Sequence, residues 1–168
     1  MQEERRLSHS YEEWPPSQSE REELARMLLG ERFVSVYDSW IKTAKRTLFQ
    51  GYQPKAPTEQ QQGYLTWIEN LPEDERYHAL SLIREIISGV VFSTLNVLDN
   101  NSGFVLHDGC WERMRILLDI MPRDENGYCL DDNPRETLGF NSDEGANLHE
   151  RWHEWLSTIS SQLKDSPI

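Results

Sequence analysis

Residues 72–99, PEDERYHALSLIREIISGVVFSTLNVLD, constrain the fold more than any other stretch of the chain. Pro72 suits the first turn of a helix, where its missing N–H is not needed, and the three acids after it complement the positive end of the helix dipole. Apolar residues then recur every three or four positions, and from Ile86 onward they cover most of the circumference. We predict one long helix at the centre of the fold, contacted on several sides, in which a polar residue at Ile86 or Val90 would prevent folding.

The bulk properties limit the class of protein. A chain of 168 residues suits a single domain with a sizeable core. Its formal net charge of -12 argues against nucleic acid as a partner, because phosphate binding depends on Lys and Arg. No stretch reads as a signal peptide and no run approaches the roughly 18 apolar residues of a membrane span, so we expect a soluble, cytoplasmic protein that binds no membrane. Cys110 and Cys129 lack the spacing of a metal or redox site, and we expect both to be buried free thiols.

The N-terminal half is predicted to be helical. Residues 1–18 are polar and are expected to form a flexible arm in front of one globular domain, residues 19–168. Helical periodicity follows over residues 19–50, after a serine cap and up to Gly51. Gly30 lies inside this pattern and predicts a kink or a break.

Two shorter helices complete the helical part. Thr58 and Gln61 form a capping-box pattern, which predicts a helix over residues 58–71. Its buried side is expected to consist of Tyr64, Leu65, Trp67 and Ile68. A last helix is predicted over residues 146–163 because its large apolar residues share one stripe. These residues are Leu148, Trp152, Trp155, Leu156, Ile159 and Leu163.

The region after Gly103 is predicted to form a small antiparallel sheet. A short strand at 104–107 is followed by Asp-Gly, a strong hairpin signal. Residues 112–121 fit both a helical and an alternating pattern, and we choose a strand that pairs with a return strand at 128–130. Residues 131–145 are expected to be a loop anchored by two apolar side chains, Leu138 and Phe140. The predicted fold class is α+β: a mostly helical domain with four or five helices around the central helix 72–99, and a hairpin or three-stranded sheet at about 104–130.

One segment of the last helix carries a motif with possible chemistry. His149, Glu150 and His153 spell H-E-x-x-H, which resembles the zinc motif of the zincin metalloproteases. The resemblance implies that the two histidines would bind zinc and that Glu150 would act as general base. The third His of the extended family pattern is absent, as is a downstream Glu ligand. We therefore prefer a helix without catalytic, metal or cofactor function, and keep a zinc-dependent hydrolase as the alternative.

Acidic residues are concentrated between Asp119 and Glu144, where eight acids stand against two arginines. A calcium loop of the EF-hand type is excluded because no Asp lies five residues before a glycine here. The acids, with two aromatic residues, are instead the candidate surface for a basic partner. These candidate residues are Asp124, Glu125, Asp131, Asp132, Glu136, Asp143, Glu144, Tyr128 and Phe140.

The predicted function is that of a non-enzymatic acidic interaction protein that occludes a basic partner, such as a toxin or a nucleic-acid-binding protein. In size, solubility and charge the chain resembles the small acidic immunity proteins with which bacteria neutralise their own toxins. The alternatives are the zinc-dependent hydrolase and a homodimeric adaptor of unknown process.

Overall fold

The computed structural model describes residues 15–52, 54–99, 105–107, 110–111, 116–122, 126, 128, 130, 132–140 and 147–161. Within these residues the chain is a mostly helical α+β domain, as predicted, with four helices and two small antiparallel sheets. The helices are α1 (Gln18–Gln50), α2 (Glu59–Glu69), α3 (Glu73–Leu98) and α4 (Leu148–Ile159). Most of the predicted N-terminal arm lies outside the described residues.

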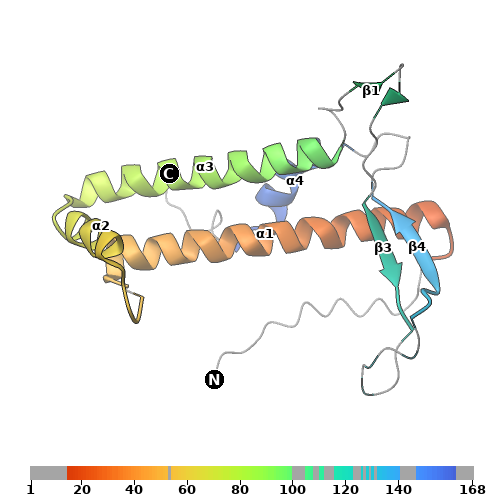
Figure 1. Cartoon of the computed structure of the whole chain (residues 1–168), viewed down its shortest axis with the longest axis horizontal. Helices are drawn as coiled ribbons and strands as arrows, with labels where there is room; N and C mark the ends of the chain where they lie inside the picture. The colour runs from red at the N-terminus through yellow and green to blue at the C-terminus, as the bar shows by residue number, and fades with distance from the viewer. Residues whose placement is uncertain are drawn as a thin grey trace.

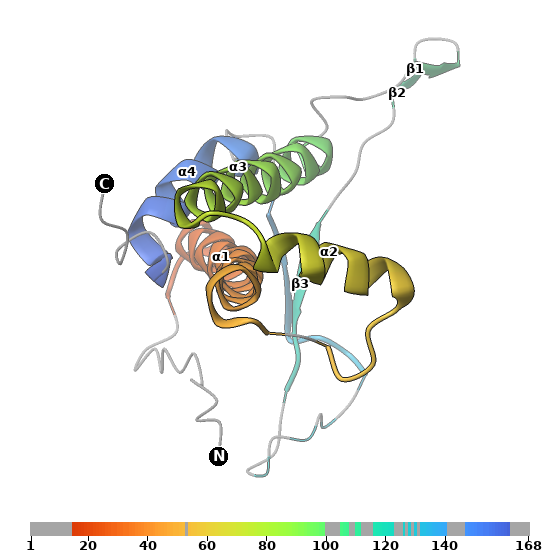
Figure 2. The same cartoon turned by 90° about the vertical axis from the view of Figure 1, so that its left-hand side faces the viewer.

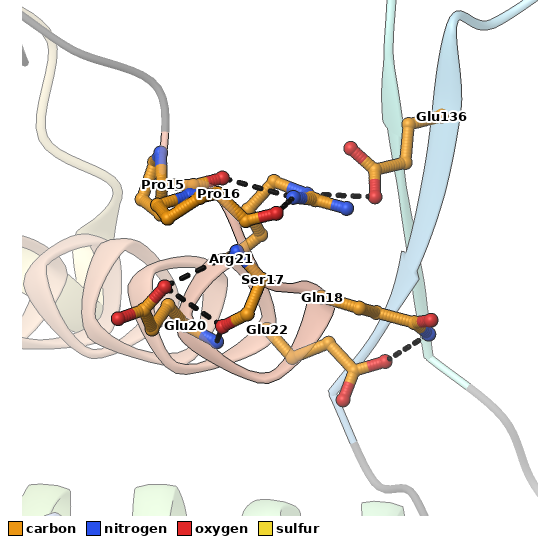
Figure 3. Close-up of polar contacts among 8 residues, drawn as sticks. All are labelled: Pro15, Pro16, Ser17, Gln18, Glu20, Arg21, Glu22 and Glu136. Atoms are coloured by element: carbon orange, nitrogen blue, oxygen red, sulfur yellow. Dashed lines mark hydrogen bonds and ion pairs between the residues drawn. The ribbon is translucent and has the colours of Figure 1, made fainter.

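Local sequence signals set the ends of α1 and α2. The Ser17 side chain accepts a hydrogen bond from the N–H of Glu20, whose carboxylate accepts one from the N–H of Ser17 at 3.2 Å (Figure 3). Gly51 ends α1 in the left-handed conformation, with φ of 64°. Thr58 and Gln61 form the predicted capping box of α2. The predicted kink or break at Gly30 is wrong, because α1 runs through this position as one continuous helix (Figure 1).

The core lies between three helices. α1 and α3 run antiparallel side by side, and α4 packs across one side of the pair (Figures 1 and 2). Trp152 of α4 is fully buried there and meets the ring of Tyr37 edge to face, with centroids 5.8 Å apart. Its indole Nε1 donates a hydrogen bond to Ser88 Oγ of α3 at 2.8 Å. One amphipathic helix thus joins the two long ones.

The predicted central burial of α3 is wrong. Its buried residues are Leu80, Val91 and Leu95, which lie on the side that α1 and α4 cover. Ile86 and Val90 are 55% and 60% exposed. The described helices can cover only part of the circumference of α3, so its wide apolar surface extends beyond the core.

The sheets differ in part from the expectation. β1 (Val105–His107) pairs antiparallel with β2 (Cys110–Trp111), and the predicted Asp-Gly turn between them lies outside the described residues. The segment 112–121, which fitted both a helix and a strand, was predicted to be a strand. β3 (Leu117–Ile120) confirms this prediction for four of its residues, and residues 112–115 lie outside the described part of the chain. The predicted return strand at 128–130 is wrong, because β3 pairs with β4 (Glu136–Gly139) in the segment expected to be a loop.

β4 holds the second sheet against α1. Leu138 is buried in the core, as expected for an anchor, and Arg21 of α1 reaches across to the strand. The Arg21 Nε atom donates to Glu136 Oε1 at 2.8 Å, and the Nη1 atom of the same guanidinium donates to the carbonyls of Pro15 and Pro16 (Figure 3). One guanidinium therefore fixes both the entry to α1 and the edge of the sheet.

Candidate functional site

α3 presents an exposed apolar stripe. Leu82, Ile86, Val90 and Val97 follow one another at intervals of four, four and seven residues, which places them on one side of the helix. All four are about half exposed or more. Ala79 and Ser93 occupy the same side, so no charged residue interrupts the stripe from Leu82 to Val97.

α1 presents a matching stripe. Val36 and Trp40 lie one turn apart, and Trp40 is 60% exposed. The half-buried Leu29 and Phe33 continue the stripe toward the start of the helix. A tryptophan with this exposure on a rigid helix is the kind of side chain that anchors protein interfaces.

Both stripes point away from α4. In α1, Asp38 accepts hydrogen bonds from Ser161 of the α4 end, and Val36 and Trp40 lie two residues to either side of Asp38. In α3, Ser88 binds Trp152 of α4, and Ile86 and Val90 again lie two residues to either side.

Two residues correspond to a turn of roughly 200° around a helix, so the α3 stripe lies opposite Ser88 and the α1 stripe lies opposite Asp38. Tyr37, which contacts Trp152 of α4, follows Val36 by one residue, so the α1 stripe is turned about 100° from that contact. Because α1 and α3 are antiparallel neighbours, the stripes form one surface, which we call the uncovered face. In Figure 1 α4 lies behind the α1–α3 pair, and the uncovered face is turned toward the viewer. Its six exposed side chains are Val36, Trp40, Leu82, Ile86, Val90 and Val97.

The uncovered face is bounded at both ends. α2 projects at one end and the β3–β4 pair at the other, both on the side away from α4 (Figures 1 and 2). The prediction that Tyr64 and Trp67 of α2 are buried is wrong, since both are more than half exposed. They line an aromatic groove of about 440 Å³ together with Tyr52, Pro54 and Ile68.

Carboxylates stand where each apolar stripe begins. Glu22 precedes Leu29 by seven residues in α1, and Glu75 precedes Leu82 by seven residues in α3. Seven residues are two turns, so each acid lies on the same side of its helix as the stripe. Because the helices are antiparallel, Glu22 lies near the β3–β4 end and Glu75 near the α2 end. One carboxylate therefore stands at each end of the uncovered face, and at the Glu22 end it shares this side of α1 with Arg26, which is largely buried and paired with Glu23 at 3.0 Å.

The structure describes part of the predicted acidic surface. Asp132 is exposed and Tyr128 is 73% exposed, as a partner-binding surface requires. Glu136 is paired with Arg21 at 2.8 Å, with both side chains largely buried. Phe140 is 4% exposed and belongs to the core, because it lies two residues after Leu138 on the same side of the strand. The prediction that Phe140 contacts a partner is wrong. Outside the described residues lie Asp124, Glu125, Asp131, Asp143 and Glu144.

The H-E-x-x-H segment has a structural contact at its first histidine. His149 Nδ1 lies 2.7 Å from Asp99 Oδ2, and the backbone N–H of His149 donates to the same oxygen at 2.9 Å. This pair ties the start of α4 to the end of α3. Glu150, the next residue, and His153, one turn further on, are both exposed. Among the described residues no group of three potential metal ligands includes them, and the zinc hydrolase stays a prediction.

A second pocket of about 410 Å³ lies on the α4 side of the helices. Tyr37, Arg84 and Glu85 line it together with Phe92 and His153. Burial raises the pKa of Tyr37, so its hydroxyl remains protonated at neutral pH. Tyr37 also packs against Trp152, which makes this pocket a part of the core boundary.

The length and composition of α3 would allow it to cross a membrane. An 18-residue window of this helix passes that test, and 17% of the window is buried. This finding differs from the expectation that no run of the chain approaches the length of a membrane span. The core helix of a soluble domain passes the same test, and Leu80, Val91 and Leu95 pack in the core.

From the sequence we expected the apolar side chains of α3, which form most of the uncovered face, to be buried in the core. The available signal was a mismatch: α3 is apolar over most of its circumference, whereas only α1 and the short α4 were available to cover it. Comparisons with protein-family models, with characterised proteins and with solved structures found no match for the chain.

Proposed function

We propose that the protein is a non-enzymatic interaction protein that binds a basic protein partner on the uncovered face. The observation that carries this proposal is the continuous apolar surface opposite α4. Its six side chains, each about half exposed, present on the order of 500 Å² of apolar surface, near the upper end of the roughly 300–600 Å² of single patches on monomers. The largest apolar patch on a monomer is often functional.

The charge of the chain supports a basic partner. The formal net charge is -12, and Glu22 and Glu75 stand at the two ends of the uncovered face. Opposite charges raise the rate of association, and apolar contacts in the centre of an interface supply most of the affinity. The role of an immunity-type inhibitor follows as the proposed biological use, in which the bound chain would occlude the working surface of a toxin.

Site-specific cross-linking tests this function. A photoreactive amino acid at Ile86 is expected to capture a partner in the native host, whereas the same group at Ser157, exposed on α4, is not. The captured protein is then purified and its dissociation constant measured at low and high salt. We expect a basic protein whose binding weakens with salt, and at least tenfold weaker binding to the double variant Ile86→Ser, Val90→Ser.

Three outcomes contradict the proposal. Cross-linking that is equal at Ile86 and Ser157 would show that the uncovered face is not the binding surface. A solution mass of twice 19.8 kDa that returns to 19.8 kDa in the double variant would favour the homodimeric adaptor. About one zinc per chain, lost in His149→Ala, would favour the hydrolase.

A further inference from the structure

We infer that the partner docks through an amphipathic helix with basic ends, which lies lengthwise between α1 and α3 on the uncovered face. This inference rests on the proposed function, because it specifies the part of the partner that the face accepts. It follows from three properties of the face: the groove between two helices, its length and the position of its charges.

The groove between α1 and α3 is already filled by a helix on the opposite side. α4 inserts Leu148, Trp152 and Trp155 there, at steps of four and three residues. Two antiparallel helices leave a groove on each side of their contact, and the second groove is lined by the two apolar stripes. A helix in that groove would complete a four-helix arrangement of α1, α3, α4 and the partner.

The length of the face suits a helix of a few turns. On the side of each helix that forms the uncovered face, every position is uncharged from Phe33 to Thr47 in α1 and from Leu82 to Val97 in α3. At about 1.5 Å per residue these segments are roughly 22 Å long, which accommodates about four helical turns. α2 and the β3–β4 pair rise at the two ends (Figure 1), so the face is shaped for an elongated ligand rather than for a flat bilayer.

The carboxylates at the ends of the face favour positive charge at the ends of the docked helix. A helix that fills the groove places its ends near Glu22 and Glu75. Lys or Arg at those ends would pair with the two carboxylates, whereas Asp or Glu would be repelled. A second copy of this chain brings another net charge of -12, which opposes self-association.

A synthetic peptide tests the inference on the full-length protein. The probe is a 16-residue capped peptide with Leu and Ile at helical spacing on one side and two Lys at each end. Fluorescence anisotropy is expected to give at least tenfold tighter binding for this peptide than for two controls: a scrambled peptide of the same composition and a version with Glu in place of Lys. The double variant Ile86→Ser, Val90→Ser and the variant Trp40→Ala should each weaken binding at least tenfold, and Ser157→Glu should leave it unchanged.

Several results would overturn the inference. Equal binding of the scrambled peptide would mean that charge alone attracts the ligand, and unchanged binding by both stripe variants would place the peptide elsewhere. Preferential binding of the wild type to vesicles of phosphatidylcholine and phosphatidylglycerol over the double variant would assign the face to lipid. A dimer of the free protein held by the face would assign it to a second copy. Circular dichroism confirms that each variant is folded. The proposed function is tested separately, by the cross-linking experiment at Ile86. If a basic partner is captured at Ile86 but the peptide does not bind, the function stands and only docking through a helix is overturned.

Discussion

Gly30 of α1 lies directly against the indole ring of Trp155 in α4: a Cβ atom at Gly30 would stand 2.6 Å from Cε2 of that ring. Ala is normally favoured over Gly inside a helix by about 1 kcal/mol. At this position the clash reverses the order, and we expect Gly30→Ala to lower the free energy of unfolding by about 1–3 kcal/mol. Urea denaturation measures the change. The control is Gly89→Ala in α3, where no atom lies within 4 Å and where the substitution should raise stability. Gain of stability in both variants would contradict the close packing of α4 on α1.

Positions 86 and 95 of α3 should respond in opposite ways to the same substitution. Ile86 is 55% exposed and Leu95 is 0% exposed. We expect Ile86→Asp to change the free energy of unfolding by less than about 1 kcal/mol, and Leu95→Asp to prevent folding because it buries an unpaired carboxylate. Circular dichroism and thermal denaturation report both results. If Ile86→Asp also unfolds the chain, α3 is covered on all sides, as the sequence alone had suggested.

The difference between Ile86 and Leu95 could not be predicted from the sequence, although the helix that carries both could. Caps and periodicity are local, so Ser17, Thr58 and Pro72 were enough to locate the three N-terminal helices. Which side of α3 becomes covered depends on how many helices reach it, which no local pattern contains. The pairing of β3 with β4 is also non-local, and the sequence of β4 has only Leu138 as a large apolar residue, too little for a strand signal.

Ser88 should matter for stability through its acceptor oxygen. Trp152 is fully buried, and its Nε1 donates to Ser88 Oγ at 2.8 Å. Ser88→Ala leaves that N–H without an acceptor, and we expect a loss of about 1–3 kcal/mol in the free energy of unfolding. Ser93→Ala, on the exposed side of α3, is the matched control and should have little effect or stabilise slightly. Equal effects of the two substitutions, measured in urea, would argue against the hydrogen bond.

Glu23 should contribute a pH-dependent link between α1 and α4. Partial burial alone would raise the pKa of Glu23, but hydrogen bonds from Arg151 and Arg26 outweigh it and lower the pKa below 4.5. A carboxyl with a lowered pKa in the folded state stabilises the protein above its unfolded pKa and loses this contribution as the pH falls.

We therefore expect Glu23→Gln to be less stable than the wild type at pH 7, with the difference shrinking as the pH falls from 4.5 through the lower pKa of the folded state. The effect should be modest because the Glu23 side chain is 41% exposed. Thermal denaturation from pH 7 to pH 3 follows it, with Glu22→Gln as control, since Glu22 accepts its hydrogen bond from Gln18 within α1. A deficit that stays constant over the whole pH range would exclude the charged link.

The candidate site was less predictable than the fold. Charge counting pointed to the segment after Asp119, and of its described members Asp132 and Tyr128 are exposed while Phe140 is buried. The contact between His149 and Asp99 joins residues 50 positions apart, so the H-E-x-x-H motif alone could not reveal it. The uncovered face was visible in the sequence only as apolar residues, and the chain had to be folded before they could be assigned to the surface.

α1 is the first helix to be synthesised, but some of its tertiary contacts can form only when the end of the chain has been made. Its Arg21 binds Glu136, 115 residues later, and its Asp38 binds Ser160, 122 residues later. At translation rates of about 5–20 residues per second, those partners emerge roughly 5–25 s after α1 itself. From the synthesis of α3 until that of α4 the nascent chain exposes both the uncovered face and the surface that α4 will later bury. The growing chain is therefore an expected client of ribosome-associated chaperones, and α4 is the segment whose arrival releases it.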